Sequence, residues 1–173
     1  TDPKSAADIK ETLHNTAQLS TKLNRLTGGD VKAGSDGKKS DFKTQIGAEV
    51  LYNPEDKKVR TDADVRLMTK DSVYTLGLSN VGNGSNLDVT YGKQVLDKVQ
   101  LRGGLFDGKL GVGADIDFGT PFSLSAALFD LRHSSYRIRS DIQLWKDTYA
   151  VGQWTWYGHD HNRVNYFGLR KTF

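Results

Sequence analysis

The sequence contains no cysteine. Without cysteine there can be no disulfide framework, no thiolate metal site and no thiol nucleophile. Long hydrophobic runs are absent as well, because no stretch approaches the roughly 20 apolar residues that a membrane-spanning helix needs. These absences exclude a disulfide-stapled domain, a thiol enzyme and a protein that crosses a membrane with helices.

The sequence also lacks a large excess of either charge sign. The chain of 173 residues has 24 basic and 21 acidic side chains and a formal net charge of +3, so charge singles out neither nucleic acid nor an anionic surface as a partner. The mean hydropathy of −0.56 fits a barrel in membrane or in water, because alternating strands keep the mean low. The start, Thr1-Asp2-Pro3, predicts a processed chain or a fragment of a longer one.

Residues 1–28 are predicted to form an amphipathic, coiled-coil-like helix in the periplasm. Its apolar residues broadly follow helical spacing without an intervening glycine or proline and form a narrow stripe of Ile9, Leu13, Leu19, Leu23 and Leu26. Such a stripe is typical of a coiled-coil seam, and thus of a homo-oligomer, or of a helix packed on its own domain. Residues 29–41, rich in Gly, Ser, Asp and Lys, are predicted to be a linker.

From residue 42 to the end, the hydrophobic period is two. Turn signals such as Asn53-Pro54 and Asp107-Gly108 separate the alternating runs. The pattern predicts an all-β domain over residues 42–173, with about ten antiparallel strands of roughly nine to thirteen residues. Sequential strands with short turns are expected to close into an up-and-down barrel, because closure removes exposed edges. Around Tyr149–Tyr157, two apolar registers conflict, which predicts a bulge in that strand.

Alternation alone does not say which face of a barrel is wet. Strand lengths near those needed to cross hydrocarbon, mixed charges on one face and aromatic residues near strand ends favour a transmembrane β-barrel. The residues predicted to face the lumen are Arg60, Asp62, Asp64, Arg66, Asp115, Asp117, Arg137, Arg139 and Asp141. The residues predicted to face lipid are Ile46, Val50, Val65, Leu67, Leu76, Val112, Ile116, Leu124, Leu128, Ile138 and Ile142.

The end of the chain carries a more specific signal. Phe167, Gly168, Leu169 and the terminal Phe173 resemble the C-terminal assembly signal of outer-membrane barrels, although Lys171 stands where an apolar residue is usual. This resemblance implies insertion by the barrel assembly machinery into the outer membrane of a diderm bacterium, with the N-terminus in the periplasm.

The layout of helix, linker and C-terminal barrel resembles the C-terminal part of MlaD-type MCE-family lipid transport proteins that carry their own barrel. This resemblance implies that the chain is the outer-membrane anchor of a trans-envelope phospholipid transport system, in which helices of a hexameric assembly form the tunnel. The lumen would then be largely filled by charged side chains. Two alternatives stay open: a small porin-like channel and a soluble lipocalin-like lipid-binding barrel.

No catalytic residue, metal ligand or cofactor is predicted, and the chain is not expected to be an enzyme or to bind nucleic acid. His159-Asp160-His161 fits a solvated hairpin loop better than a metal site. The acidic pairs Asp62/Asp64 and Asp115/Asp117 are expected to pair with arginines rather than to act as general acid and base. His133 beside Ser134-Ser135 is the best remaining catalytic candidate.

Overall fold

The computed structural model describes residues 43–81, 84–118, 121–159 and 162–173, and everything below refers to these ranges. The predicted helix 1–28 with its apolar stripe, the linker 29–41 and Phe42 lie outside them. The described residues form ten strands: β1 (Lys43–Asn53), β2 (Lys58–Met68), β3 (Ser72–Ser79), β4 (Asn86–Leu96), β5 (Val99–Phe106), β6 (Lys109–Asp117), β7 (Phe122–Phe129), β8 (Ser135–Trp145), β9 (Thr148–Tyr157) and β10 (Asn162–Thr172).

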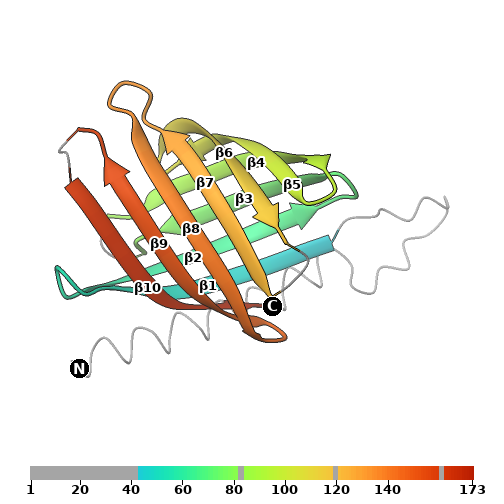
Figure 1. Ribbon diagram of the computed structural model, residues 1–173, viewed down its shortest axis with the longest axis horizontal. Helices are drawn as coiled ribbons and strands as arrows, with labels where there is room; N and C mark the ends of the chain where they lie inside the picture. The colour runs from blue at the N-terminus through green and yellow to red at the C-terminus, as the bar shows by residue number, and fades with distance from the viewer. Residues whose placement is uncertain (1–42, 82–83, 119–120, 160–161) are drawn as a thin grey trace.

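Each strand pairs antiparallel with the next, and β10 returns to pair with β1, so the sheet closes into a barrel. Figure 1 shows the tilted strands running around this barrel in chain order. The predicted closed, antiparallel, up-and-down barrel of about ten strands is therefore confirmed. The strands contain 8 to 11 residues and are therefore somewhat shorter than the predicted nine to thirteen. None of the described ranges contains a helix long and apolar enough to span a membrane.

The antiparallel meander gives the barrel two distinct ends. The terminal end carries Lys43 at the start of β1, Phe173 after β10, and the connections β2–β3, β4–β5, β6–β7 and β8–β9. The distal end carries the five remaining connections, among them the Asp107-Gly108 turn between β5 and β6. Both groups of connections are short, so little of the described chain lies outside the barrel wall.

Strand β9 keeps regular alternation from end to end. Among the described strand pairs, register shifts occur only at Gln94/Leu96 in β4 and at Gln143/Trp145 in β8. The predicted bulge in residues 149–157 is therefore wrong. Apolar residues occupy both faces of β9. Cross-strand partners share a face of the sheet. Val151 pairs with the interior Asp141, whereas Trp154 pairs with the exposed Ile138.

Two glycines permit close strand approach. Gly104 in β5 has φ of +147°, and a Cβ there would lie 2.1 Å from the carbonyl oxygen of Val89 in β4. A Cβ on Gly168 in β10 would lie 1.9 Å from the carbonyl oxygen of Val50 in β1. Both distances are far below van der Waals contact, so only glycine fits at these points of the wall.

Candidate functional site

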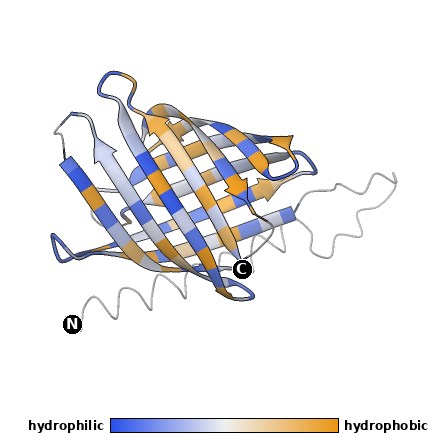
Figure 2. Cartoon of the chain, viewed as in Figure 1, coloured by the Kyte–Doolittle hydropathy of each residue, from blue (hydrophilic) through white to orange (hydrophobic). Residues whose placement is uncertain are grey.

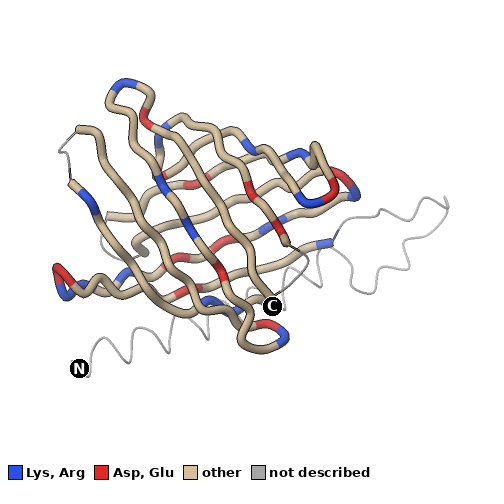
Figure 3. Tube along the Cα trace, in the orientation of Figure 1, with Lys and Arg blue, Asp and Glu red and all other residues tan. Residues whose placement is uncertain are grey.

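The barrel interior is charged and its exterior is apolar. Glu49 and Arg170 are 3% and 5% exposed, whereas Leu76 and Leu110 on the outside are 55% and 61% exposed. Figure 2 shows hydrophobic and hydrophilic residues alternating along the strands, and Figure 3 shows both charge signs distributed along them. This distribution is the reverse of a water-soluble protein, in which large apolar side chains are buried and charged ones exposed.

All nine residues predicted to face the lumen lie on the interior side of the wall. Each of them lines the main internal cavity. The interior-facing set follows the register around the barrel, since Asp64 pairs with Gly47 and Gly77, and Asp141 pairs with Ser123 and Val151.

A central ion-pair cluster joins β1, β2, β8 and β10. Arg139 donates two hydrogen bonds to the two carboxylate oxygens of Glu49 at 2.8 and 2.6 Å, and also binds Asp141. Arg170 donates to Glu49 at 3.3 Å and to Asp64 at 2.8 Å. Bidentate arginine–carboxylate pairs of this kind are the strong, geometrically specific ion pairs of protein interiors. The cluster ties the closing strand pair β1/β10 to β2 on one side and to β8 on the other.

A second cluster lies near the distal end. Arg60 holds both oxygens of Asp62 at 2.7 and 2.6 Å, while Arg137 pairs with Asp107 of the β5–β6 turn. Ser79 also donates to Asp107 at 2.9 Å. Burial raises the pKa of the Asp107 carboxyl, but the guanidinium groups of Arg137 and Arg60 outweigh burial and hold that pKa below its ordinary value.

Aromatic side chains pack together inside the distal end of the lumen, beside this second cluster. Phe106 and Phe129 are almost fully buried, and their ring centroids are 6.3 Å apart. Tyr157 packs edge-on against Phe129 at 6.4 Å, and the Arg137 guanidinium lies 5.0 Å from the same ring. Together with Ala127 these rings form a hydrophobic core cluster. We call Phe106, Phe129 and Tyr157 the distal plug.

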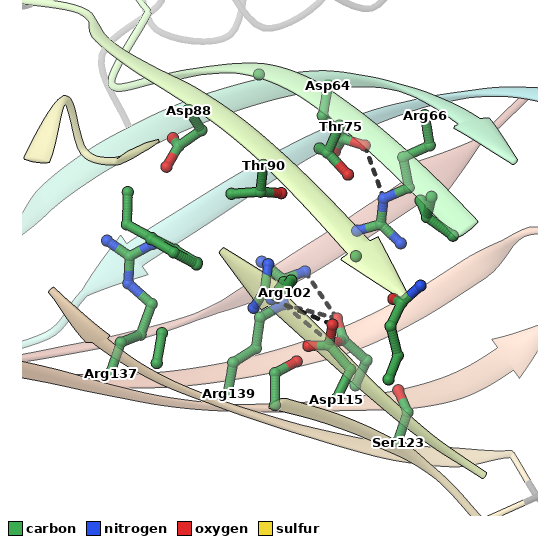
Figure 4. Close-up of a pocket in the computed structure, with 18 of the residues that line it drawn as sticks. Asp64, Arg66, Thr75, Asp88, Thr90, Arg102, Asp115, Ser123, Arg137 and Arg139 are labelled. Atoms are coloured by element: carbon green, nitrogen blue, oxygen red, sulfur yellow. Dashed lines mark hydrogen bonds and ion pairs between the residues drawn. The ribbon is translucent and has the colours of Figure 1, made fainter. Parts of the chain in front are cut away.

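Between the plug and the terminal end, the lumen holds a cavity of about 460 Å³. Arg66, Thr75 and Thr90 line one wall, and Arg102, Arg139 and Asp115 point into the same space from other strands (Figure 4). The lining reaches Asp97 and Lys98 in the β4–β5 turn, so the cavity extends to the terminal end. A neighbouring cavity of about 270 Å³ shares Arg66 and Asp117 with it.

The eleven residues predicted to face lipid lie on the exterior side of the wall, at alternate positions to the interior set. Five of them are large exposed hydrophobic residues, of which Val112 is the most exposed at 58%: Leu67, Leu76, Val112, Ile138 and Ile142. Ile46 differs, because it is only 2% exposed. Its backbone exchanges hydrogen bonds of 3.2 and 2.8 Å with Phe173.

Exterior aromatic residues gather toward the two ends of the barrel. Near the terminal end, Tyr74 and Tyr91 have ring centroids 5.0 Å apart, and Phe118 and Phe122 stack at 5.4 Å. At the distal end, exposed Tyr136 pairs in register with Trp156, and Tyr52 is exposed near the end of β1. We call these two groups the aromatic bands.

The four residues of the predicted assembly signal lie in and after β10. Phe167 and Leu169 are exposed on the outside, Gly168 packs against β1, and Phe173 is partly exposed at the terminal end. Lys171, which departs from the signal, lies 3.9 Å from Asp147 in the β8–β9 turn. The signal thus coincides with the strand that closes the barrel.

Asp160 and His161 lie outside the described ranges, so only the remaining catalytic and metal candidates can be placed. His133 pairs with Asp130 at 3.6 Å and stacks on His159, while the Ser135 hydroxyl accepts a hydrogen bond from Gly158. Asp130 has a pKa below its ordinary value because Lys109 donates a hydrogen bond to it. Within the described ranges, no group of three or more histidine or acidic residues is placed to hold a metal ion.

Several interior residues were not singled out from the sequence: Glu49, Arg102, Asp107, Arg170 and the distal plug. Even spacing from a charged residue of the same strand was the available signal for some of them. Phe106, for example, lies at an even number of positions from Arg102 on β5, although its apolar side chain gave no hint of an interior place.

A closed antiparallel meander with a charged interior and an apolar outer surface defines an up-and-down β-barrel of inverted polarity. Residues 80–173 match a family model described as a lipocalin-like domain. The chain therefore belongs to this family of lipocalin-like domains. No curated protein matches the chain.

Three solved structures show more distant similarity. Two are variants of the Rh. blastica porin, each 13% identical with a TM-score of 0.41, covering 78% and 79% of this chain. The chain spans only 56% and 53% of those porin chains. The third, a de novo designed transmembrane β-barrel, is 8% identical with a TM-score of 0.40, covering 79% of this chain and 98% of the design. Similarities of this size carry no information about function.

Proposed function

We propose that the barrel spans the outer membrane and serves as an anchor, not as an open channel or an enzyme. The observation that supports this proposal most strongly is the inverted polarity of the wall. Exposed apolar side chains cover the outside of the strands, while ion pairs and polar groups fill the inside. Transmembrane β-barrels need this arrangement, because hydrocarbon lies outside and water inside.

The free energy of removing apolar side chains from water favours lipid outside the barrel. Moving a leucine-sized side chain out of water stabilises a protein by about 1.5–3 kcal/mol. In water, the exterior apolar residues, such as Leu76, Leu110 and Leu169, would forgo this stabilisation and form a large contiguous patch of the kind that soluble monomers avoid. The two aromatic bands fit the headgroup levels on either side of an apolar belt.

The anchor role is supported by the side chains that occupy the lumen. The distal plug and the pair of Arg137 with Asp107 obstruct one end, and a ten-stranded barrel leaves a narrow interior. A soluble carrier of apolar ligands would need an apolar interior, whereas the cavity here is lined by arginines, carboxylates, serines and threonines. The family match to lipocalin-like domains is compatible with an up-and-down barrel of either polarity.

The finer role in this proposal is the outer-membrane end of a trans-envelope phospholipid transport system, with the N-terminus in the periplasm. It is supported by the resemblance of the chain layout to barrel-bearing MlaD-type proteins. The proposed partners are phospholipids, the barrel assembly machinery and further copies of the chain joined through residues 1–28. Deleting residues 1–28 is expected to abolish oligomers and leave the barrel folded, as measured by multi-angle light scattering.

Membrane insertion is tested by gel mobility with and without boiling. We expect the full chain to fold only with detergent or lipid, and the folded form to shift on boiling. Folding to a monomer in plain buffer would contradict the membrane proposal. The anchor role is tested by planar-bilayer conductance, where we expect no ion current. A steady current that disappears when lumen charges are changed would establish a channel instead.

A further inference from the structure

The cavity carries more hydrogen-bond donors than the barrel itself uses. Arg66 donates to Asp64 through Nε alone, at 3.1 Å, and its two terminal nitrogens have no hydrogen-bond partner among the described residues. Arg102 lies beside Asp115, with Nε 3.1 Å from a carboxylate oxygen, and likewise has no partner for its terminal nitrogens. These two side chains differ from Arg139, which directs all three of its nitrogens at carboxylates.

Two buried donors are incompletely satisfied. The Nε atoms of Arg102 and Arg137 are inaccessible to solvent and form no well-aligned hydrogen bond with a described residue, although Arg102 Nε lies 3.1 Å from the Asp115 carboxylate with which it forms an ion pair. A buried donor left unsatisfied costs about 1–3 kcal/mol, and more for a charged group. The planar array of N–H groups in arginine matches the oxygens of carboxylates and phosphates, so these side chains can bind an added oxyanion besides their carboxylate partners.

The four guanidinium groups face one space. Arg66 extends from β2, Arg102 from β5, and Arg137 and Arg139 from β8, and all four line the cavity together with the hydroxyl groups of Thr75 and Thr90 (Figure 4). The volume of about 460 Å³ lies in the range of small-molecule sites. The distal plug lies at one side of this space and the lining reaches the β4–β5 turn at the other, so we expect a ligand to enter from the terminal end.

We propose that the lumen is a binding site, closed at its distal end, for a phosphate oxyanion, with Arg66 and Arg102 as its principal ligands. Phosphate oxygens accept the paired N–H groups of arginine in the geometry that guanidinium offers. The phosphate can belong to free inorganic phosphate or to the headgroup of a phospholipid. The side of entry rests on the proposed function, which places the terminal end in the periplasm, but the binding itself does not.

The test is isothermal titration calorimetry of the full chain, in whichever medium it folds, at constant ionic strength. The probes are inorganic phosphate and glycerophosphoethanolamine, which is a headgroup without acyl chains, with chloride as the reference anion. We expect saturable binding of one equivalent of a phosphate probe and none of chloride. Comparable affinity for both phosphate probes would identify free phosphate as the ligand, and at least tenfold tighter binding of glycerophosphoethanolamine would identify the headgroup.

Variants locate the site. Arg102→Gln and Arg66→Gln are each expected to weaken phosphate binding at least about tenfold, because each removes charge-assisted hydrogen bonds. Arg102→Lys keeps the charge without the planar donors, so we expect partial recovery. The matched control is Arg163→Gln, an exposed distal-end arginine 3.9 Å from Glu55, which should bind like the wild type. The boiling-dependent gel shift confirms that each variant is folded.

The proposal is overturned if neither phosphate probe binds at millimolar concentration. It is also overturned if Arg66→Gln, Arg102→Gln and Arg163→Gln, all folded, bind phosphate equally. Because the titration works in detergent or in buffer, a protein that proves soluble would refute the membrane proposal and leave this one to be decided on its own.

Discussion

At the scale of single residues, Glu49 is the carboxylate that joins the two arginines of the central ion-pair cluster. It is buried and receives hydrogen bonds from both Arg139 and Arg170. Removing one partner of a buried ion pair leaves an uncompensated charge and costs about 3–5 kcal/mol. Glu49→Gln keeps the volume of the side chain and should lower the free energy of unfolding by about that amount, measured by reversible urea unfolding in lipid or detergent.

The matched control is Glu55→Gln at the distal end. Glu55 is half-exposed and lies 3.9 Å from Arg163, so its loss should cost less than about 1 kcal/mol. Equal unfolding midpoints for the Glu49 and Glu55 variants would show that the central cluster is screened by lumen water and contributes little.

Single interior residues differ in how far the sequence reveals them. The alternation around Arg60, Asp62, Asp64 and Arg66 is enough to assign them to one face. Their partners are not predictable in the same way, since Arg139 and Glu49 lie 90 residues apart and meet only because the sheet closes. Closure depends on the stagger of all ten strands, which no local pattern contains.

At the scale of elements, the β5–β6 hairpin is tied to the barrel through its turn. Asp107 pairs with Arg137 and accepts from Ser79, and its N–H donates to Asp88 at 2.9 Å. A carboxyl with a lowered folded-state pKa stabilises above its unfolded value of about 3.9, and this stabilisation is lost as pH falls through the folded value. We therefore expect Asp107→Asn to be less stable than the wild type at pH 7.

The difference in urea midpoint between wild type and Asp107→Asn should shrink steadily as the pH falls below about 4. Asp147→Asn, in the β8–β9 turn at the other end, is the control, and its midpoint at pH 7 should match the wild type. A difference for Asp107→Asn that stays constant down to the lowest pH would mean that the carboxylate charge is not what holds the hairpin.

Elements were easier to predict than the details of their ends. Asp107-Gly108 is a strong hairpin signal, and the structure has a turn there. The same dipeptide gave no sign that the aspartate side chain reaches into the lumen, because turn propensity concerns the backbone only. The apparent register conflict in β9 arose because Val151 is apolar and interior, while the tryptophans are apolar and exterior.

At the scale of the whole molecule, a period of two fixes that one face of the wall is polar but leaves open which face. The answer lies in the closed structure, where charged groups from β1, β2, β8 and β10 meet inside. The distal plug could not be predicted, because Phe106 and Phe129 are apolar like the exterior residues. Only their odd or even position along the strand distinguishes them.

The orientation of the tryptophans allows the polarity of the whole barrel to be measured in a membrane. Trp154 lies on the exterior, with its ring 5.8 Å from that of exposed Phe167. In a Trp145→Phe/Trp156→Phe variant, Trp154 is the one tryptophan left to emit under tryptophan-selective excitation, since the chain has three tryptophans. If the wall faces hydrocarbon, lipids brominated on the acyl chain should quench this fluorescence strongly, whereas aqueous iodide should not. Strong iodide quenching of the folded protein, with no effect of brominated lipid, would place this wall in water. The urea-unfolded chain is the control, and its fluorescence should be quenched by iodide alone.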